Sequence, residues 1–216
     1  MKRNLYFLFL LLSFILLGCG GDIKISIYTR DLSEVADSKE NIIYTNANMI
    51  VESLDDEKDI EFLRQNLNGF SNEHAVQYNY STSLSFDIKV PIVSDENSIN
   101  FSKDLLSLIC KKNNDEINCY LKYNKNLISK IQSYIYSAHY QSIDLSEFKL
   151  KLEINNDERK NRYFTSYSSY VNGTPYPFVH EDPLNERDRI SLEVSEIFTN
   201  YISSLHASNY PLFTIK

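Results

Sequence analysis

The stretch VQYNYSTSLSFDIKV, residues 76–90, alternates two kinds of side chain over its whole length. From Val76 to Val90 every second residue is apolar or is a tyrosine or threonine, and the residues between them are polar or charged. A period of two is typical of a β-strand that has one face buried and the other in water. The pattern therefore predicts one long strand, and Pro91 either ends it or marks it as an edge strand, because proline has no N–H to donate to a neighbouring strand.

Shorter segments on both sides show either this alternation or a helical spacing. Strand-forming residues occur in four of them, residues 23–27, 41–53, 148–154 and 190–194. Asn172-Gly173 predicts a hairpin turn between residues 162–171 and 174–179. Apolar residues at helical spacing occur in three segments, residues 53–70, 124–140 and 195–207. Together these segments predict an α+β fold, a mostly antiparallel sheet with about three helices on one face.

The N-terminus carries the features of an export signal. Met1 to Asn4 is a short basic segment, and Leu5 to Leu17 is an apolar run that is too short to span a bilayer comfortably. This run ends in Leu16-Leu17-Gly18-Cys19, which resembles the lipobox of bacterial lipoproteins. The resemblance implies a signal peptide of residues 1–18, acylation of Cys19 and a mature domain of residues 19–216.

Acylation would decide where the protein is located. Two or more acyl chains anchor a protein to a membrane stably, whereas one chain does so only marginally. Gly20, rather than an aspartate, follows the cysteine. By the sorting rule of enteric lipoproteins, this implies the outer membrane, with the domain facing the periplasm. An uncleaved signal anchor, or cleavage at another position, is the alternative.

Composition narrows the possible partners. The chain has a formal net charge of −7, so it lacks the basic excess of a nucleic-acid-binding protein or of a protein held by anionic headgroups. We therefore expect membrane lipid attached through acylated Cys19 as the anchor, and no nucleic acid as a partner. The polar segment near residues 93–103 leaves open whether the chain forms one domain or two subdomains, residues 22–93 and 103–216.

Two further cysteines lie on a candidate hairpin. Asn114 and Asp115 tolerate the positive φ angles of a two-residue turn, and a turn there places Cys110 opposite Cys119. Counted outward from the turn, the cysteines form a non-hydrogen-bonded pair, whose Cα atoms approach to about 4.5 Å. A disulfide can span that distance, and exported proteins meet oxidising conditions. The spacing predicts a Cys110–Cys119 disulfide; two buried thiols or a metal pair are the alternatives.

No motif in the sequence is typical of an enzyme. The chain contains no H-E-x-x-H spacing, no phosphate-binding loop, no G-x-S-x-G turn and no dinucleotide fingerprint. His180-Glu181-Asp182 and NNDERKN, residues 155–161, carry charged side chains, and we interpret both as solvated turns. We therefore expect no catalytic residue, no metal and no cofactor.

Tyrosines crowd the hairpin around Asn172-Gly173. They include Tyr163, Tyr167, Tyr170 and Tyr176. These tyrosines occupy both odd-numbered and even-numbered positions, so one set of rings can pack on the core while the other set is exposed. Exposed tyrosine is enriched in recognition surfaces, which makes these four residues a candidate binding surface. The alternative is purely structural, because tyrosine suits strands whatever their function.

Three segments of the chain carry a family resemblance. They are IYTRDLSEVA at residues 27–36, VPIV at residues 90–93 and LKLEINNDERKNRYFTSYSSYVNGTPYPF at residues 150–178. With the lipobox cysteine before them, they resemble an uncharacterised group of bacterial and phage-borne lipoproteins that share a domain of unknown function. The resemblance implies an exported lipoprotein domain and supplies no activity or catalytic residue.

These features predict a membrane-anchored lipoprotein of the bacterial envelope. Its expected role is non-enzymatic, as an accessory, binding or structural component that works through contacts with a protein partner. Two alternatives stay open. One is an envelope hydrolase with an unrecognised site, and the other is a phage-derived exclusion factor that masks a receptor.

Overall fold

A computed structural model shows a protein built mostly from strands. It describes residues 19–203 and 210–216, apart from residues 53, 55, 80 and 141. The strands in this part are β1 Cys19–Tyr28, β2 Ile42–Glu52, β3 Ser71–Tyr78, β4 Ser81–Val93, β5 Leu106–Asn113, β6 Glu116–Tyr123, β7 Ile143–Asn155, β8 Arg162–Val171, β9 Thr174–Leu184, β10 Arg189–Val194 and β11 Phe213–Ile215. The helices are α2 Thr29–Ala36, α3 Glu57–Asn66, α4 Lys125–His139 and α5 Glu196–Ser203, with a 3-10 turn at Glu96–Ser98.

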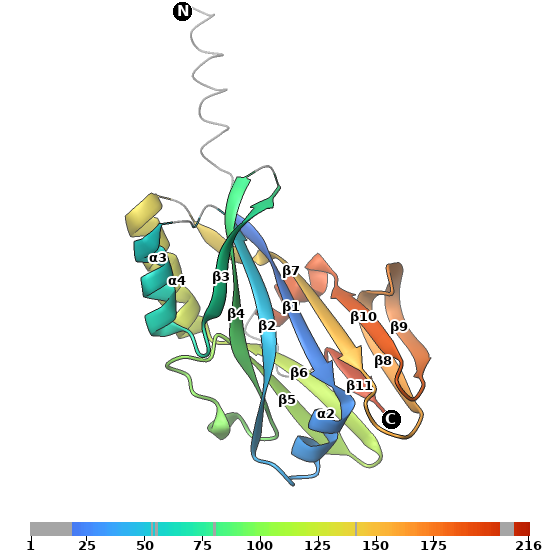
Figure 1. Ribbon diagram of the computed structural model, residues 1–216. Coiled ribbons are helices and arrows are strands. Elements are labelled where there is room, and N and C mark those ends of the chain that lie inside the picture. Colours follow the sequence, from blue (N-terminus) through green and yellow to red (C-terminus); the bar gives the residue numbers. More distant parts are fainter. Residues whose placement is uncertain (1–18, 53, 55, 80, 141, 204–209) are drawn as a thin grey trace, which may run out of the picture.

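Nine of these strands close into a barrel. Their order around the ring is β10-β7-β1-β2-β4-β5-β6-β11-β8, and pairing between β8 and β10 completes it. β3 pairs with β4, and β9 pairs with β8, so both of these strands lie outside the ring (Figure 1). Strands of residues 22–93 and strands of residues 103–216 share this one ring, since β1 pairs with β7 and β4 pairs with β5.

The expected α+β fold, with helices on one face of a mostly antiparallel sheet, is wrong. The sheet is closed, and helices lie at both of its ends: α3 and α4 at one end and α2 at the other (Figure 1). Closure requires pairing between segments far apart in the chain, such as β8 with β10 and with β11. Local alternation of side chains carries no information about such pairing, so the sequence pattern could not reveal the barrel.

Apolar side chains fill the inside of the ring. Ile23, Ile25 and Ile27 of β1 are completely buried there. α3 and α4 pack against one end of this core and leave an apolar gap of about 30 Å³, which is too small for a ligand larger than water. α2 covers the other end with Leu32 and Val35, which are also completely buried.

The stretch at residues 76–90 forms a hairpin and not the single strand that its alternation predicts. Tyr78 ends β3, Ser81 begins β4, and these two residues pair across the turn. Asn79 in the turn has a φ of 45°, a conformation that asparagine adopts more readily than most residues. Paired residues share a face of the sheet, so Tyr78 lies on the side of Ser81 and not on the side of the buried apolar residues of β4. β4 also continues through Pro91 to Val93.

The charged loop between β7 and β8 is exposed at residues 157 and 159–161, as expected of a solvated turn, but other side chains of the loop form a clasp on α2. Asn156 is buried, and its side-chain amide donates to the carbonyl oxygens of Lys160, Leu184 and Asn185 at 2.9–3.0 Å. Its side-chain oxygen accepts a hydrogen bond from the hydroxyl of Thr29 at 3.0 Å. Because Thr29 is the first residue of α2, this loop fixes the start of the helix.

Charged residues of the same loop bind the first turns of α2. The Asp157 carboxylate accepts from the backbone N–H of Arg30 at 3.0 Å, which satisfies a donor left free at the helix start. Arg162 is mostly buried and donates to Glu158 at 2.7 Å and to the Ser33 hydroxyl at 2.8 Å. A buried charge needs such partners, because an unpaired one is strongly destabilising. Two of the three segments that carry the family resemblance thus meet at the clasp.

The hairpin of β5 and β6 has the predicted register, with Cys110 paired to Cys119. The predicted disulfide is not present: both cysteines are free thiols, and their sulfur atoms lie 3.4 Å apart. Both side chains are completely buried inside the barrel. Burial and the neighbouring Cys110 raise the pKa of the Cys119 thiol well above its ordinary value.

Substitution of Asn156 by alanine should destabilise the protein strongly. Asn156→Ala removes the donor to three carbonyl oxygens, and an unsatisfied buried group costs about 1–3 kcal/mol. We expect urea denaturation to show a loss of about 3 kcal/mol in the free energy of unfolding. The control Asn126→Ala changes an exposed residue of α4 and should shift this value by about 0.5 kcal/mol or less. Equal effects of the two substitutions would contradict the clasp.

Iodoacetamide should alkylate Cys110 and Cys119 slowly in the folded protein at pH 8. Both thiols are buried, and the raised pKa of Cys119 keeps it protonated and weakly nucleophilic. In urea, the peptides that contain Cys110 and Cys119 should each gain the full mass of the alkyl group without any reductant. Fast reaction of the folded protein would contradict the burial. Reaction in urea that depends on a reductant would contradict the free thiols.

Candidate binding surface on the β8–β9 hairpin

Three of the four predicted tyrosines lie on the outer face of the hairpin formed by β8 and β9. Tyr163, Tyr167 and Tyr170 alternate along β8 with residues that are buried in the barrel, so these tyrosines point outward. A bulge at Ser168, whose φ is 44°, shifts the alternation by one residue. This shift places Tyr170 on the same face as the other two although its number is even.

Tyr176 faces the opposite way. It pairs with the buried Ser169, packs against the core and stacks on the ring of His180, with 3.4 Å between the ring centroids. His180 lies in strand β9, not in the solvated turn that we expected, and its Nε2 lies 2.8 Å from Asp182. Ser166 pairs with His180, which brings together the residue types of a hydrolase triad. The Ser166 hydroxyl, however, is buried and has no hydrogen-bond partner in the described part of the chain, so His180 does not activate it in this arrangement.

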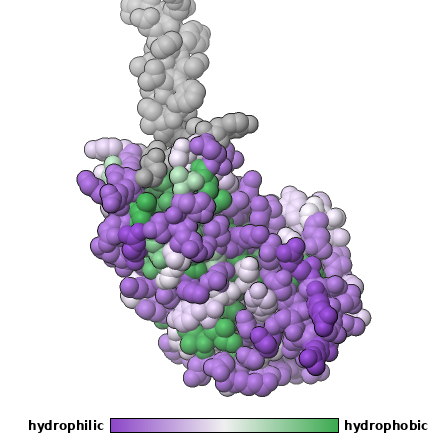
Figure 2. Space-filling view, in the orientation of Figure 1, coloured by the Kyte–Doolittle hydropathy of each residue, from purple (hydrophilic) through white to green (hydrophobic). Residues whose placement is uncertain are grey.

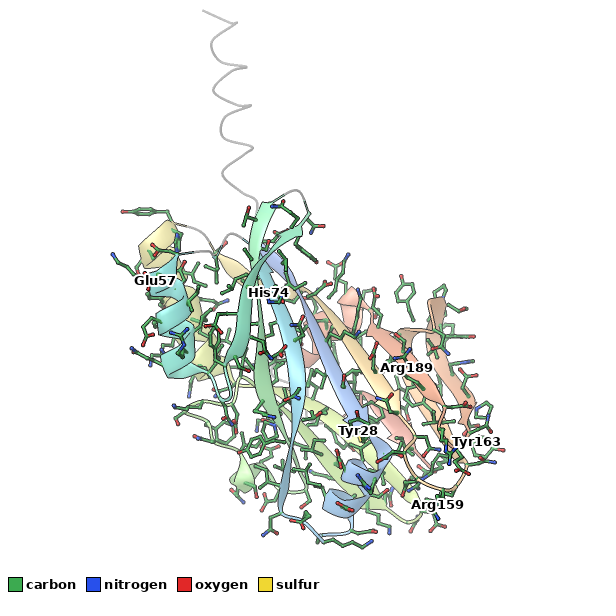
Figure 3. All side chains as sticks on the ribbon, in the orientation of Figure 1. Tyr28, Glu57, His74, Arg159, Tyr163 and Arg189 are labelled. Atoms are coloured by element: carbon green, nitrogen blue, oxygen red, sulfur yellow. The ribbon has the colours of Figure 1, made fainter. Side chains whose placement is uncertain are left out.

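Large apolar side chains are exposed on the hairpin. Tyr163 is 56 % exposed, Tyr170 42 %, Phe178 80 % and Val179 65 %. Figure 3 places Tyr163 on the side of the molecule away from α3 and α4. Exposed apolar side chains that gather on one element indicate an interaction site. We call Tyr163, Tyr167, Tyr170, Phe178 and Val179 the hairpin surface.

The free edge of β9 is protected against pairing with another strand. Pro175, Pro177 and Pro183 all lie in β9, and none of them has an N–H to donate. Prolines in an edge strand hinder the addition of a further strand. A partner is therefore expected to contact the side chains of the hairpin surface and not to extend the sheet.

Polar groups border the hairpin surface. The hydroxyl oxygens of Tyr167 and Thr214 lie 3.4 Å apart, and Thr214 donates to the side-chain oxygen of Asn118 at 2.8 Å. The ammonium of Lys216 lies 3.1 Å from the carboxylate of Glu116. An aromatic centre with a polar rim is the usual composition of a protein–protein interface.

A polar groove of about 430 Å³ lies on the outside of the barrel, next to Tyr170. Residues of β1, β2, β7 and β10 line it, and the face seen in Figure 2 is mostly hydrophilic. Within the groove, Lys24 lies 2.8 Å from Glu153 and Lys151 lies 3.6 Å from Asp22. Each lysine that lines the groove thus has a carboxylate partner, so the described residues offer no free cation for a phosphate group.

A buried carboxylate joins α3 to α4. Asp59 is 1 % exposed; one of its oxygens accepts from the Tyr134 hydroxyl at 3.1 Å and lies 2.9 Å from Nε2 of His139. The other oxygen has no hydrogen-bond partner within the described residues. Burial and the hydrogen bond to Asp59 raise the pKa of Tyr134. This contact was not predictable from the sequence, because Asp59 and His139 lie on different helices and nothing in either segment shows that the helices pack together.

The remaining predicted sites concern the anchor and metals. Cys19 is the first residue of β1, and the predicted signal peptide, residues 1–18, lies outside the described residues. Within the described part, no three His, Cys, Asp or Glu side chains are placed to hold a metal ion. Across the same residues, no helix has both the length and the apolar character that a membrane span requires.

Comparison with known proteins identifies the family but no activity. Neither a curated protein nor a solved structure matches the chain. One family model, a domain of unknown function (DUF7424), matches residues 21–216, which include the barrel from the third residue of β1 to its last strand. The chain therefore belongs to the DUF7424 family.

Proposed function

We propose that the protein is a lipid-anchored accessory protein of the bacterial envelope that binds a protein partner through the hairpin surface. The observation that supports this most is the exposure of Tyr163, Tyr170, Phe178 and Val179. β9 lies outside the closed ring, so the residues exposed on this strand are not required to complete the barrel.

The anchor in this proposal is an acyl group on Cys19. The apolar run of residues 5–17 and the lipobox support it. The strand that follows is held firmly: the backbone N–H of Gly20 donates to the Glu52 carboxylate at 3.1 Å, and Gly21 pairs with Val51. A domain joined to its anchor in this way stays close to the membrane, and its partner must be reachable there.

Non-enzymatic binding agrees better with the geometry than hydrolysis does. The most suggestive catalytic grouping, Ser166 with His180 and Asp182, has a buried hydroxyl that no hydrogen bond connects to the histidine. The polar groove has its lysines paired with carboxylates. The hairpin surface, in contrast, combines exposed aromatic rings with hydroxyl groups, and tyrosine is enriched where proteins bind one another.

Substitution of the lipobox cysteine tests the anchor. Cys19→Ala should abolish incorporation of radioactive palmitate and release the protein from the membrane fraction, because the only acylation site is lost. Cys110→Ala is the matched control and should leave both properties unchanged. Membrane association of Cys19→Ala that equals that of the unchanged protein would refute lipid anchoring.

Site-specific photocrosslinking in cells tests the hairpin surface. A photoreactive phenylalanine analogue at Tyr163, Tyr170 or Phe178 should give one discrete crosslinked protein. The same analogue at Tyr28 or Tyr44, which are 45 % and 42 % exposed elsewhere on the barrel, should not. Val179→Ser should weaken the adduct formed from position 163, by about tenfold if the residue contributes 1.4 kcal/mol to binding. An adduct of equal yield from all five positions, or from none, would argue against this surface.

A further inference from the structure

The end of the barrel that carries Cys19 also exposes two tyrosines, one in the last turn of α4 and one directly after it. Cys19 pairs with Ile143, the first residue of β7. Tyr140, directly after α4, lies three residues before Ile143, a reach of at most about 10 Å. Tyr140 is 83 % exposed, and Tyr136, one helical turn earlier, is 62 % exposed. Figure 1 shows this end of α4 at the same end of the barrel as the start of β1.

A third large apolar side chain belongs to the same end. β7 runs parallel to β1, and β10 runs antiparallel to β7, so β10 leads toward the end where β1 begins. α5 follows β10 directly, and Ile197, its second residue, is 82 % exposed. A single exposed apolar residue is ordinary, so Ile197 matters here only because it lies at the same end of the barrel as Tyr136 and Tyr140.

We propose that Tyr136, Tyr140 and Ile197 contact the surface of the membrane to which Cys19 is attached. This inference rests on the proposed acylation. No spacer separates Cys19 from β1, so the anchor holds this end of the barrel against the headgroups. Tyrosine suits that position because its ring is apolar while its hydroxyl stays hydrated, and it is enriched at both interfaces of a bilayer.

Acidic residues at the same end favour a membrane of low charge. Asp56 and Glu57 at the start of α3 are exposed, and α3 follows the end of β2, where Val51 pairs with Gly21. Anionic lipids attract basic segments, and by the same electrostatics they repel these carboxylates. The surface is therefore suited to zwitterionic headgroups such as phosphatidylethanolamine.

Tyrosine nitration can measure the contact. The full chain, with its acyl group confirmed by mass, is added to vesicles of phosphatidylethanolamine and phosphatidylcholine and treated with tetranitromethane. We expect Tyr136 and Tyr140 to be nitrated on the order of fivefold more slowly than in Cys19→Ala mixed with the same vesicles. Tyr28 and Tyr44, near the opposite end of the barrel, should react equally in both samples.

Three other outcomes of this experiment would each contradict the proposal. Equal nitration of Tyr140 in acylated and unacylated protein would overturn the contact while leaving the anchor intact. Absence of acyl mass on Cys19 would overturn the proposed anchoring and the contact with it. Protection of Tyr28 to the same degree as Tyr140 would show that the protein is covered without a preferred end, which also overturns the contact.

Lipid charge supplies an independent test. Raising the share of phosphatidylglycerol to about half should reduce the protection of Tyr140, because Asp56 and Glu57 are then repelled. The variant Asp56→Asn with Glu57→Gln should remove this dependence. Asparagine keeps the cap that Asp56 provides to the N–H of Lys58, so the helix start is preserved. Protection that is the same in both vesicle types for the unchanged protein would contradict the preference for zwitterionic lipid.

Discussion

Closure of the barrel depends on the bulge at Ser168. One edge of β8 pairs with β9 along its length, and the other edge is shared by two strands: β11 pairs with residues 164–166 and β10 with residues 169–171. Tyr167 and Ser168 lie between these two pairings, and the positive φ of Ser168 bends the strand and increases its twist. An unbent β8 would align with β11 or with β10 but not with both, and the ring would then keep an open edge. Closure leaves β3 and β9 as the strands outside the ring, and three prolines protect β9.

The same bulge sets the chemistry of the candidate binding surface. Before it, odd-numbered residues of β8 point outward; after it, Tyr170 does. On β9, residues 177 and 178 lie opposite the bulge, where the register shifts. Phe178 is among the most exposed apolar residues. Tyr176 and His180, four residues apart, are brought close enough to stack. One backbone irregularity thus joins the fold to the exposed aromatic rings, and a substitution that straightened β8 would be expected to disturb both.

Local features of the chain were predictable, and long-range ones were not. The register of Cys110 with Cys119 and the hairpin at Asn172-Gly173 follow from turn chemistry and parity, and both are confirmed. Tyr163, Tyr167 and Tyr170 lie on one outer face, but the parity of residue numbers could not assign Tyr170 and Tyr176 to their faces because the bulge shifts the alternation. The clasp around Asn156 was not predicted, because its partners, Thr29 and Leu184, are distant in sequence. Charged residues in a loop indicate exposure to solvent only when no other segment of the chain packs against them.

Because no spacer separates Cys19 from β1, the position of each surface along the barrel determines its distance from the membrane. If the anchor holds the start of β1 at the headgroups, Tyr140 lies at that level and the clasp on α2 lies at the far end of the barrel. β8 extends over ten residues between these levels, about 30 Å, with Tyr163 near the clasp and Tyr170 beside the groove. A partner of the hairpin surface must then present its own contacts within that distance of the bilayer. A protein attached to the same membrane meets this condition directly, whereas a soluble partner meets it only if it fits beside the barrel above the headgroups.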